Sequence, residues 1–278
     1  MPKLNGWRID LENFDELFGM KGEDEVMALC GSYNEVAFDP RQLLVVENQG
    51  SMGSCQGNSI SSGCEWLYIL ATGKTDVQLS RAYGYYRSQM KDGLLGRDAG
   101  STINSGIWVA TQLGIPLESE WKYSDRYNPK PPKPWEVLDT LGSNFRIGKS
   151  IRLTTYDAIR TFLGAGIGMV HIGITWNSST DRAVVDSFNP NGGGGHSIGL
   201  YSLSDRKDNQ GRPYVWMMNS WGKTWGTEGW AEWSPRSIEQ MLQARFSVFI
   251  GISEMPNVKP REWKLDDIKK KVKWWVTA

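Results

Sequence analysis

Apolar residues in the first half of the chain recur at the spacing of helices. From Cys55 onward they recur at steps of three and four residues, which places them on one helical face, and Gly73 is a natural stop. The stretch "VQLSRAYGYYRSQM" predicts a second helix with Ser80 as its N-cap. A third helix, in "STINSGIWVATQLGI", is expected to begin near Ser101 and to end at Gly114.

The pattern changes to that of strands beyond a proline-rich stretch. The segment "NPKPPKPW" at 128–135 can form neither a helix nor a central strand, and it predicts an extended crossing between two halves. Five strand-like runs follow, namely "GIGMVHIGITW", "HSIGLYSLS", "YVWMMNSWG", "GWAEW" and "RFSVFIGIS". A helical first half and a strand-rich second half predict an α+β fold of two packed lobes.

These patterns divide the chain into three parts. Residues 1–39 are predicted to be a short N-terminal extension that precedes the main domain. The main domain spans 40–255, with a helical lobe at about 40–127 and a β lobe at about 136–255. Residues 256–278 form a basic tail whose apolar residues share one face of a predicted helix. We expect the tail to dock on its own domain rather than to lie on a membrane surface, because Asp266 and Asp267 interrupt its basic face, and a protein partner for it is also possible.

The composition limits the classes of partner and compartment. Lysine plus arginine and aspartate plus glutamate both number 31, and this zero net charge argues against nucleic acid as a partner. No apolar run is long enough to span a membrane, and the first residues lack the apolar core of a secretory signal. With 3 cysteines, too few for a disulfide framework, we expect a cytoplasmic protein, or a particle-associated one if the source is viral.

One cysteine stands where a nucleophile is expected. In "NQGSMGSC", Cys55 follows small residues and begins the first predicted helix, whose N-terminus favours the thiolate. His196 follows a glycine run and can act as its base, whereas His171 lies inside an apolar run and is expected to be a buried strand histidine. Asn219, at a strand end, can orient the base. The side-chain amide of Gln49 and the backbone N–H of Cys55 can stabilise an oxyanion.

Three blocks together resemble the signatures of the papain-like cysteine peptidases, the peptidase C1 family. They are "NQGSMGSC", "GHSIGLYS" and "NSWGKTWGTEGW", and the resemblance extends from about residue 40 to about residue 255. It implies Cys55 as nucleophile, His196 as base, Asn219 as orienting residue and Gln49 in the oxyanion hole. His196 follows Cys55 by 141 residues, within the roughly 130–150 expected. The implied fold has a helical lobe and an antiparallel, β-barrel-like lobe with the active-site cleft between them.

Four further positions are expected to contact the substrate. Gly53 and Ser54 are small and leave room for a peptide backbone beside the nucleophile. "DAGSTINSG" is similar to a stretch in the bacterial and viral branch of the family, where the glycine lines the cleft, so Gly100 is a candidate contact. The indole of Trp221 is expected to cover the Asn–His hydrogen bond and to keep water away from it.

The chain also departs from the family pattern. Gln56 follows the nucleophile where the family usually has tryptophan, and Met52 stands where secreted members have a half-cystine. The lead-in is too short for the long helical propeptide, and "GWRIDL" looks like the short lead-in of some bacterial members, so we expect an ordered N-terminal extension. The resemblance implies no cofactor, and two histidines with three scattered cysteines make no zinc-type metal site.

The sequence is compatible with three functions. The first, which we expect, is a cysteine endopeptidase that hydrolyses the bonds of a peptide or protein substrate. The second is a papain-fold amidase or transpeptidase that acts on cell-wall or isopeptide bonds. The third is a papain-fold binding or structural component of a larger assembly, a viral one included. The motifs of the first two would look the same, so only substrate profiling separates them.

Overall fold

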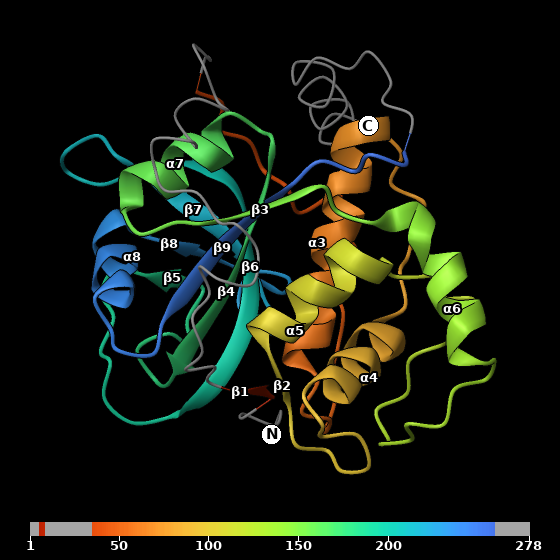
Figure 1. The fold of residues 1–278 in the computed structure, drawn as a ribbon. Helices are drawn as coiled ribbons and strands as arrows, with labels where there is room; N and C mark the ends of the chain where they lie inside the picture. Colours follow the sequence, from red (N-terminus) through yellow and green to blue (C-terminus); the bar gives the residue numbers. More distant parts are fainter. Residues whose placement is uncertain (1–5, 9–34, 259–278) are drawn as a thin grey trace.

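The computed structural model describes residues 6–8 and 35–258, and two lobes make up this part of the chain (Figure 1). The predicted tail helix and most of the N-terminal extension lie outside the described residues. The helical lobe consists of α3 (Cys55–Thr72), α4 (Arg81–Lys91), α5 (Ile103–Trp108), a π-helical turn (Val109–Leu113), α6 (Trp135–Gly142) and a 3-10 turn (Ser143–Phe145).

The second lobe is built on a seven-stranded sheet. In spatial order its strands are β3 (Lys149–Arg152), β9 (Val248–Ser253), β4 (Gly168–Trp176), β6 (Gly194–Lys207), β7 (Pro213–Met218), β8 (Trp230–Trp233) and β5 (Val184–Val185). All neighbours pair antiparallel except β5 and β8, which run parallel. The predicted α+β arrangement of two lobes is confirmed, and the β lobe is an open sheet with β3 and β5 at its edges rather than a closed barrel.

The three predicted helices form, with one change of boundary. Gly73 ends α3 in the left-handed conformation, at φ 67°, and its N–H donates to Ile69. The hydroxyl of Ser80 caps α4 as predicted. The third helix is capped by Thr102 instead of Ser101, because Ser101–Thr102 forms the short strand β2, which pairs in parallel with β1 (Trp7–Arg8).

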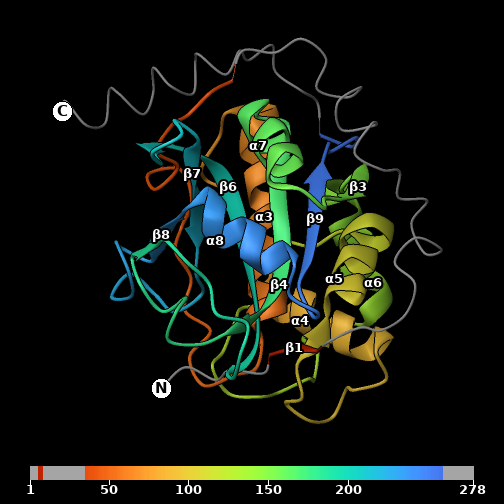
Figure 2. The same cartoon turned by 90° about the vertical axis from the view of Figure 1, so that its left-hand side faces the viewer.

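The sheet separates two hydrophobic cores, and α3 packs in the first of them. Side chains alternate along the strands, so Met169 joins the core around α3 while its neighbour Val170 joins the core on the other face. Figure 2 shows α7 (Tyr156–Gly164) and α8 (Pro235–Leu242) in front of the sheet, on the face away from α3. The sequence pattern did not predict α6, α7 or α8, because each is a single helix of 8 or 9 residues and too short to show a clear period.

Glycines allow α3 to approach its neighbours closely on two sides. A side chain at Gly57 would lie 2.6 Å from Cβ of Tyr85 on α4, and one at Gly63 would lie 3.0 Å from Ile252 on β9. The contacts on both sides leave the helix little room to shift, because protein interiors are close-packed. The position of Cys55, the first residue of α3, is therefore set by both lobes.

A carboxylic acid is buried on α3, in the core of the helical lobe. Glu65 is 2% exposed, and its Oε1 accepts the backbone N–H of Leu79 at 2.7 Å. Burial raises the pKa of Glu65 from 4.5 to about 8, although the Leu79 hydrogen bond acts in the opposite direction. The folded chain therefore holds this proton at pH values where the unfolded chain releases it.

We expect the contribution of Glu65 to the free energy of unfolding to decrease as pH rises. Between about pH 4.5 and 8 the unfolded state binds fewer protons at this residue, so this contribution falls with rising pH. Glu65→Gln keeps an acceptor for Leu79 and removes the titration. The difference in melting temperature, variant minus wild type, should be several degrees larger at pH 8 than at pH 5. Glu136→Gln, an exposed change on α6, is the control, and an identical shift in both variants would contradict the argument.

Candidate active site

The N-terminus of α3 presents its first amide groups without a side-chain cap. Ser54 occupies the N-cap position, but its hydroxyl does not bond to the first turn. It lies 2.5 Å from the hydroxyl of Tyr123 and accepts from the side chain of Asn58. The positive end of the helix dipole is thus directed at Cys55, which favours negative charge at that position. Ser54, expected to contact substrate, is fully buried in this hydrogen-bonded arrangement.

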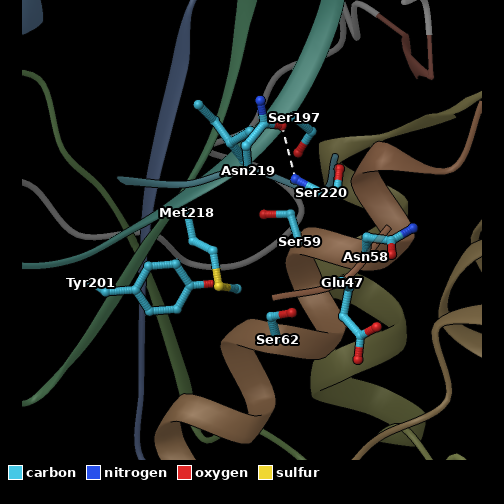
Figure 3. Close-up of a pocket in the computed structure, with 10 residues that line it drawn as sticks. Glu47, Asn58, Ser59, Ser62, Ser197, Tyr201, Met218, Asn219 and Ser220 are labelled. Carbon is cyan, nitrogen blue, oxygen red and sulfur yellow. Dashed lines mark hydrogen bonds between the residues drawn. The ribbon is translucent and has the colours of Figure 1, made fainter. Parts of the chain in front are cut away.

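His196 and Asn219 form a hydrogen bond whose donor can be assigned. The Oδ1 atom of Asn219 accepts the backbone N–H of Ser220 at 2.8 Å, which fixes the orientation of the amide (Figure 3). The same Oδ1 lies 2.8 Å from Nε2 of His196. Because a carbonyl oxygen only accepts, Nε2 carries the proton, and Nδ1 of the neutral ring keeps a free lone pair. Nδ1 has no hydrogen-bond partner among the described residues.

Cys55 lies beside the strand that carries His196. The backbone amide of Ser197, the residue after His196, hydrogen-bonds to the thiol, and so does the amide of Gln56. Both Cys55 and His196 are fully buried. The helix N-terminus and the start of β6 therefore meet at the sulfur atom.

Burial keeps both groups neutral in this structure. It raises the pKa of the Cys55 thiol to about 12, although the amides of Ser197 and Gln56 favour the thiolate. It lowers the pKa of His196 to about 4, against the opposing effects of the Asn219 hydrogen bond and the charge of Asp181. The thiol and the imidazole are therefore unreactive in this structure, because water does not reach them.

Tryptophans enclose the imidazole of His196. The ring of Trp221 lies over it at 4.9 Å and an angle of 31°, and Trp176 meets it edge-on at the same distance. Trp225 contacts both tryptophans and donates to Asp181 at 2.6 Å. Trp221 thus covers the imidazole that hydrogen-bonds to Asn219. Trp176 is an additional wall that sequence reasoning missed, because it comes from the end of β4.

Gln49 is tied to the residue that follows Asn219. Its Oε1 accepts from the hydroxyl of Ser220 at 2.7 Å, and its backbone N–H donates to the Ser220 carbonyl at 2.8 Å. Its side-chain amide donates to the carbonyl of Met52 at 2.8 Å, which holds it on the loop before Cys55. Ser220 therefore links the proposed oxyanion donor to the proposed orienting residue. Nothing in the motif singled out this serine beyond its place next to Asn219.

Gly53 and Gly100 lie on the helical-lobe side of Cys55. The N–H of Gly53 donates to Asp98 at 3.0 Å, and Asp98 also accepts from the hydroxyl of Tyr85. Gly100 has a φ of 78°, a left-handed conformation suited to glycine, immediately before β2. Asp98 was missed as a positioning residue, although it is the acidic residue of the quoted "DAG" triplet.

Gln56, which stands where the family usually has tryptophan, takes part in the packing beneath the site. Its Oε1 accepts from the hydroxyl of Ser101 at 2.7 Å, which connects the first turn of α3 to β2. A side chain at Gly106 would lie 1.5 Å from the amide of Gln56, so α5 closes over it. Gln56 is fully buried and serves the packing of the site's floor.

The segment Gly6–Arg8 lies directly against the thiol. A side chain at Gly6 would come within 2.7 Å of both the sulfur of Cys55 and the carbonyl of Gly53. The Gly6 carbonyl accepts the N–H of Ser101 at 3.1 Å, which begins the β1–β2 pairing. This part of the predicted N-terminal extension is therefore ordered and covers the nucleophile.

A small cavity borders Asn219 between α3 and the strands β6 and β7 (Figure 3). It is too small for a substrate side chain. Its lining consists of Glu47, Asn58, Ser59, Ser62, Ser197, Ile198, Tyr201, Met218, Asn219 and Ser220. Nearby, the hydroxyl of Ser59 lies 2.9 Å from Nδ1 of His171, the buried strand histidine, whose pKa burial lowers to about 3.

The described residues contain neither a candidate metal site nor a candidate membrane span. Within 6–8 and 35–258, no three His, Cys, Asp or Glu side chains gather in a group that could hold a metal ion. No helix of these residues is both long and apolar enough to cross a membrane.

Comparisons with known proteins agree on one family. A model of the papain family cysteine proteases matches residues 35–247. An uncharacterized peptidase C1-like protein of Acanthamoeba polyphaga mimivirus is 24% identical over 214 residues, which cover 69% of this chain and 67% of the relative.

Solved structures share the fold at low sequence identity. Xylellain, a cysteine protease from Xylella fastidiosa, superposes with a TM-score of 0.72 at 22% identity, over 91% of this chain and 97% of xylellain. The digestive procathepsin L2 proteinase from Tenebrio molitor gives a TM-score of 0.65 at 17% identity, over 90% and 78% of the two chains. Since the family model spans most of this chain, the protein belongs to the papain family of cysteine proteases and is a cysteine-type peptidase.

Proposed function

We propose that the protein is an endopeptidase in which Cys55, His196 and Asn219 form the catalytic triad. The observation that carries this proposal is the assigned donor of the His196–Asn219 hydrogen bond, 2.8 Å long. This hydrogen bond leaves Nδ1 of His196 unprotonated and basic. The next residue on the strand is Ser197, whose backbone amide contacts the Cys55 sulfur. These are the two requirements for transferring the thiol proton to a base.

The reaction follows from these positions. Nδ1 of His196 takes the thiol proton, and the Cys55 thiolate attacks the carbonyl carbon of a peptide bond. The negative oxygen is stabilised by the backbone N–H of Cys55 and the side-chain amide of Gln49. His196 then protonates the leaving amine, which departs and leaves a thioester on Cys55. Water, deprotonated by His196, attacks the thioester, releases the carboxylic acid and restores the thiol.

The remaining expected contacts have roles in substrate binding. Gly53 and Gly100 lack side chains and line the approach of a substrate backbone to the sulfur, and Ser54 holds the loop that carries Gly53. Trp221 covers the ring of His196 and excludes water from its bond to Asn219. The substrate class is accordingly a peptide or an extended segment of a protein.

Covalent labelling tests the nucleophile and its base. An epoxysuccinyl peptide is expected to add once, at Cys55, and intact mass followed by peptide mapping measures the adduct. Cys55→Ser and His196→Ala should lose it, because one lacks the sulfur and the other lacks the base. Cys64→Ser is the matched control and should keep it, since Cys64 lies inside α3 in the hydrophobic core, away from the helix N-terminus and from His196. Equal labelling of Cys30, Cys55 and Cys64 would contradict an activated Cys55.

Two substitutions at Asn219 test its orienting role. Asn219→Ala leaves the Nε2–H of His196 without an acceptor, so the ring can rotate or change tautomer, and kcat should fall by roughly 10²-fold or more. Asn219→Asp keeps an oxygen for both His196 and Ser220 and should recover part of the loss. Peptide hydrolysis gives kcat and KM, and melting temperatures show whether each variant is folded. Equal activity of both variants would argue against the orienting role.

A further inference from the structure

Three tryptophan rings, here called the tryptophan cluster, lie against the imidazole of His196 or against one another. Trp221 covers the imidazole with 4.9 Å between the ring centres, and Trp176 meets it edge-on at the same distance. Trp225 packs on both of these rings, at 5.7 Å from Trp176 and 6.0 Å from Trp221. Aromatic faces attract a cation, so these surroundings favour a positive charge on His196.

The carboxylate of Asp181 is held at the edge of the tryptophan cluster. The indole N–H of Trp225 donates to its Oδ1 at 2.6 Å. A hydrogen bond to an ionised acceptor is short and strong, so it fixes the position of a side chain that is otherwise exposed. Asp181 lies outside the three signature blocks of the sequence.

The turn that carries Asp181 is closed by several hydrogen bonds. It follows β4 directly, and the carbonyl of Asn177 accepts the backbone N–H groups of Thr180, at 3.0 Å, and of Asp181, at 3.2 Å. The hydroxyl of Thr180, a fully buried residue, accepts the N–H of Asn177 at 3.0 Å. The side-chain amide of Asn177 donates to the carbonyl of Asn189 at 2.7 Å, which ties the turn to the segment before β6. The backbone that places the Asp181 carboxylate is therefore fixed.

Asp181 supplies a negative charge that the other elements around His196 lack. The titratable group that α3 brings to the site is the Cys55 thiol, while β4 and the loop after β7 bring the uncharged tryptophan cluster and the amide of Asn219. Burial has the largest effect on the pKa of His196 and lowers it, whereas the Asn219 hydrogen bond and the charge of Asp181 raise it. Two exposed cations nearby in the sequence are not among the groups that shift this pKa, namely Arg182 and Lys223.

We propose that Asp181 is a positioning residue whose carboxylate stabilises the protonated form of His196 across the tryptophan cluster. This inference rests on the function proposed above, in which His196 takes the proton of Cys55 and later gives it to the leaving amine. Both steps pass through an imidazolium ion. The Cys55 thiolate balances that charge directly, and Asp181 adds a second negative charge beyond the rings. Because rings and not water lie between the two charges, their attraction is screened less than in bulk solvent.

The pH dependence of labelling by the epoxysuccinyl peptide measures the protonated form of His196. The Cys55 thiolate forms a sulfur–carbon bond while a carbon–oxygen bond of the epoxide breaks, and the imidazolium gives its proton to the leaving oxygen. The labelling rate therefore falls at high pH, where the imidazolium loses this proton. The midpoint of the fall is an apparent pKa of the thiol–imidazole pair. Iodoacetamide needs only the thiolate, so alkylation by it should show no such fall.

Asp181→Asn separates the charge from the hydrogen bond. The amide keeps an oxygen for the indole N–H of Trp225 and removes the negative charge, so the imidazolium should lose its proton more easily. The high-pH midpoint should then move to lower pH by about half a pH unit. Asp181→Glu keeps the charge and should restore most of the midpoint. Asp186→Asn is the matched control, because it removes the same charge from an exposed residue that accepts from Tyr214, and its midpoint should equal that of wild type.

Salt gives a second measurement. Asp181 is exposed, so its charge should be screened in about 1 M NaCl, where the Debye length is about 3 Å. The difference in midpoint between wild type and Asp181→Asn should fall to less than about half of its value at low salt. Melting temperatures show whether each variant is folded. If Asp181→Asn does not fold, Trp225→Phe carries the test, because it removes the N–H that holds the carboxylate and should lower the midpoint in the same direction.

The results that contradict the inference differ from those that contradict the proposed function. A midpoint in Asp181→Asn that moves no more than that of Asp186→Asn would overturn the role of the Asp181 charge. A shift in Asp181→Ala without one in Asp181→Asn would overturn it as well, because Asp181 would then serve only as the acceptor for Trp225. If the wild-type protein does not label at Cys55 over Cys64 at any pH, the proposed function itself fails, and the inference falls with it.

Discussion

The close packing of α3 between the two lobes is the constraint on which the rest of the site depends. Gly57 lets the helix touch α4, and Gly63 lets it touch the sheet, so its first residue cannot shift toward either side. Cys55 is thereby held where the amide of Ser197 contacts its sulfur. Reactions between positioned groups lose rate steeply when an atom moves by about 1 Å. A helix fixed from two sides supplies that precision.

A two-residue unit, Asn219–Ser220, then organises the chemistry on the sheet side. The backbone N–H of Ser220 orients the amide of Asn219, and that amide determines which nitrogen of His196 is protonated. The hydroxyl and carbonyl of Ser220 hold Gln49 from the other lobe. The proposed base and the proposed oxyanion donor are thus coupled through one serine. A disturbance at Ser220 would displace both together.

Burial works against reactivity in the covered form of the site. Excluding water from Cys55 and His196 leaves the thiol and the imidazole neutral. The pKa of each group is then far from the value that an active pair needs. Among the described residues, Gly6 lies against the thiol, and the ring of the next residue, Trp7, packs on the sheet at Gly173 and Gly195.

The sequence by itself determined the fold class, the helix that starts at Cys55 and the identity of the candidate triad. Helical spacing, strand-like runs and glycine or serine caps act between residues close together in the chain, so their pattern is legible without coordinates. The same holds for motifs in which Cys55, His196 and Asn219 each sit in a characteristic local setting. The short helices α6, α7 and α8 were missed because few residues carry their periodicity.

Only the tertiary structure decided how these pieces meet. Contacts across strands and lobes leave Nδ1 of His196 free, let Ser220 bind both Asn219 and Gln49, and place Trp176 against the imidazole. Above all, the ring of Trp7 packs at Gly173 and Gly195, more than 160 residues further along the chain. No local pattern encodes such a contact. In the sequence, a strand glycine that faces solvent or the core cannot be told from one against which an aromatic ring packs.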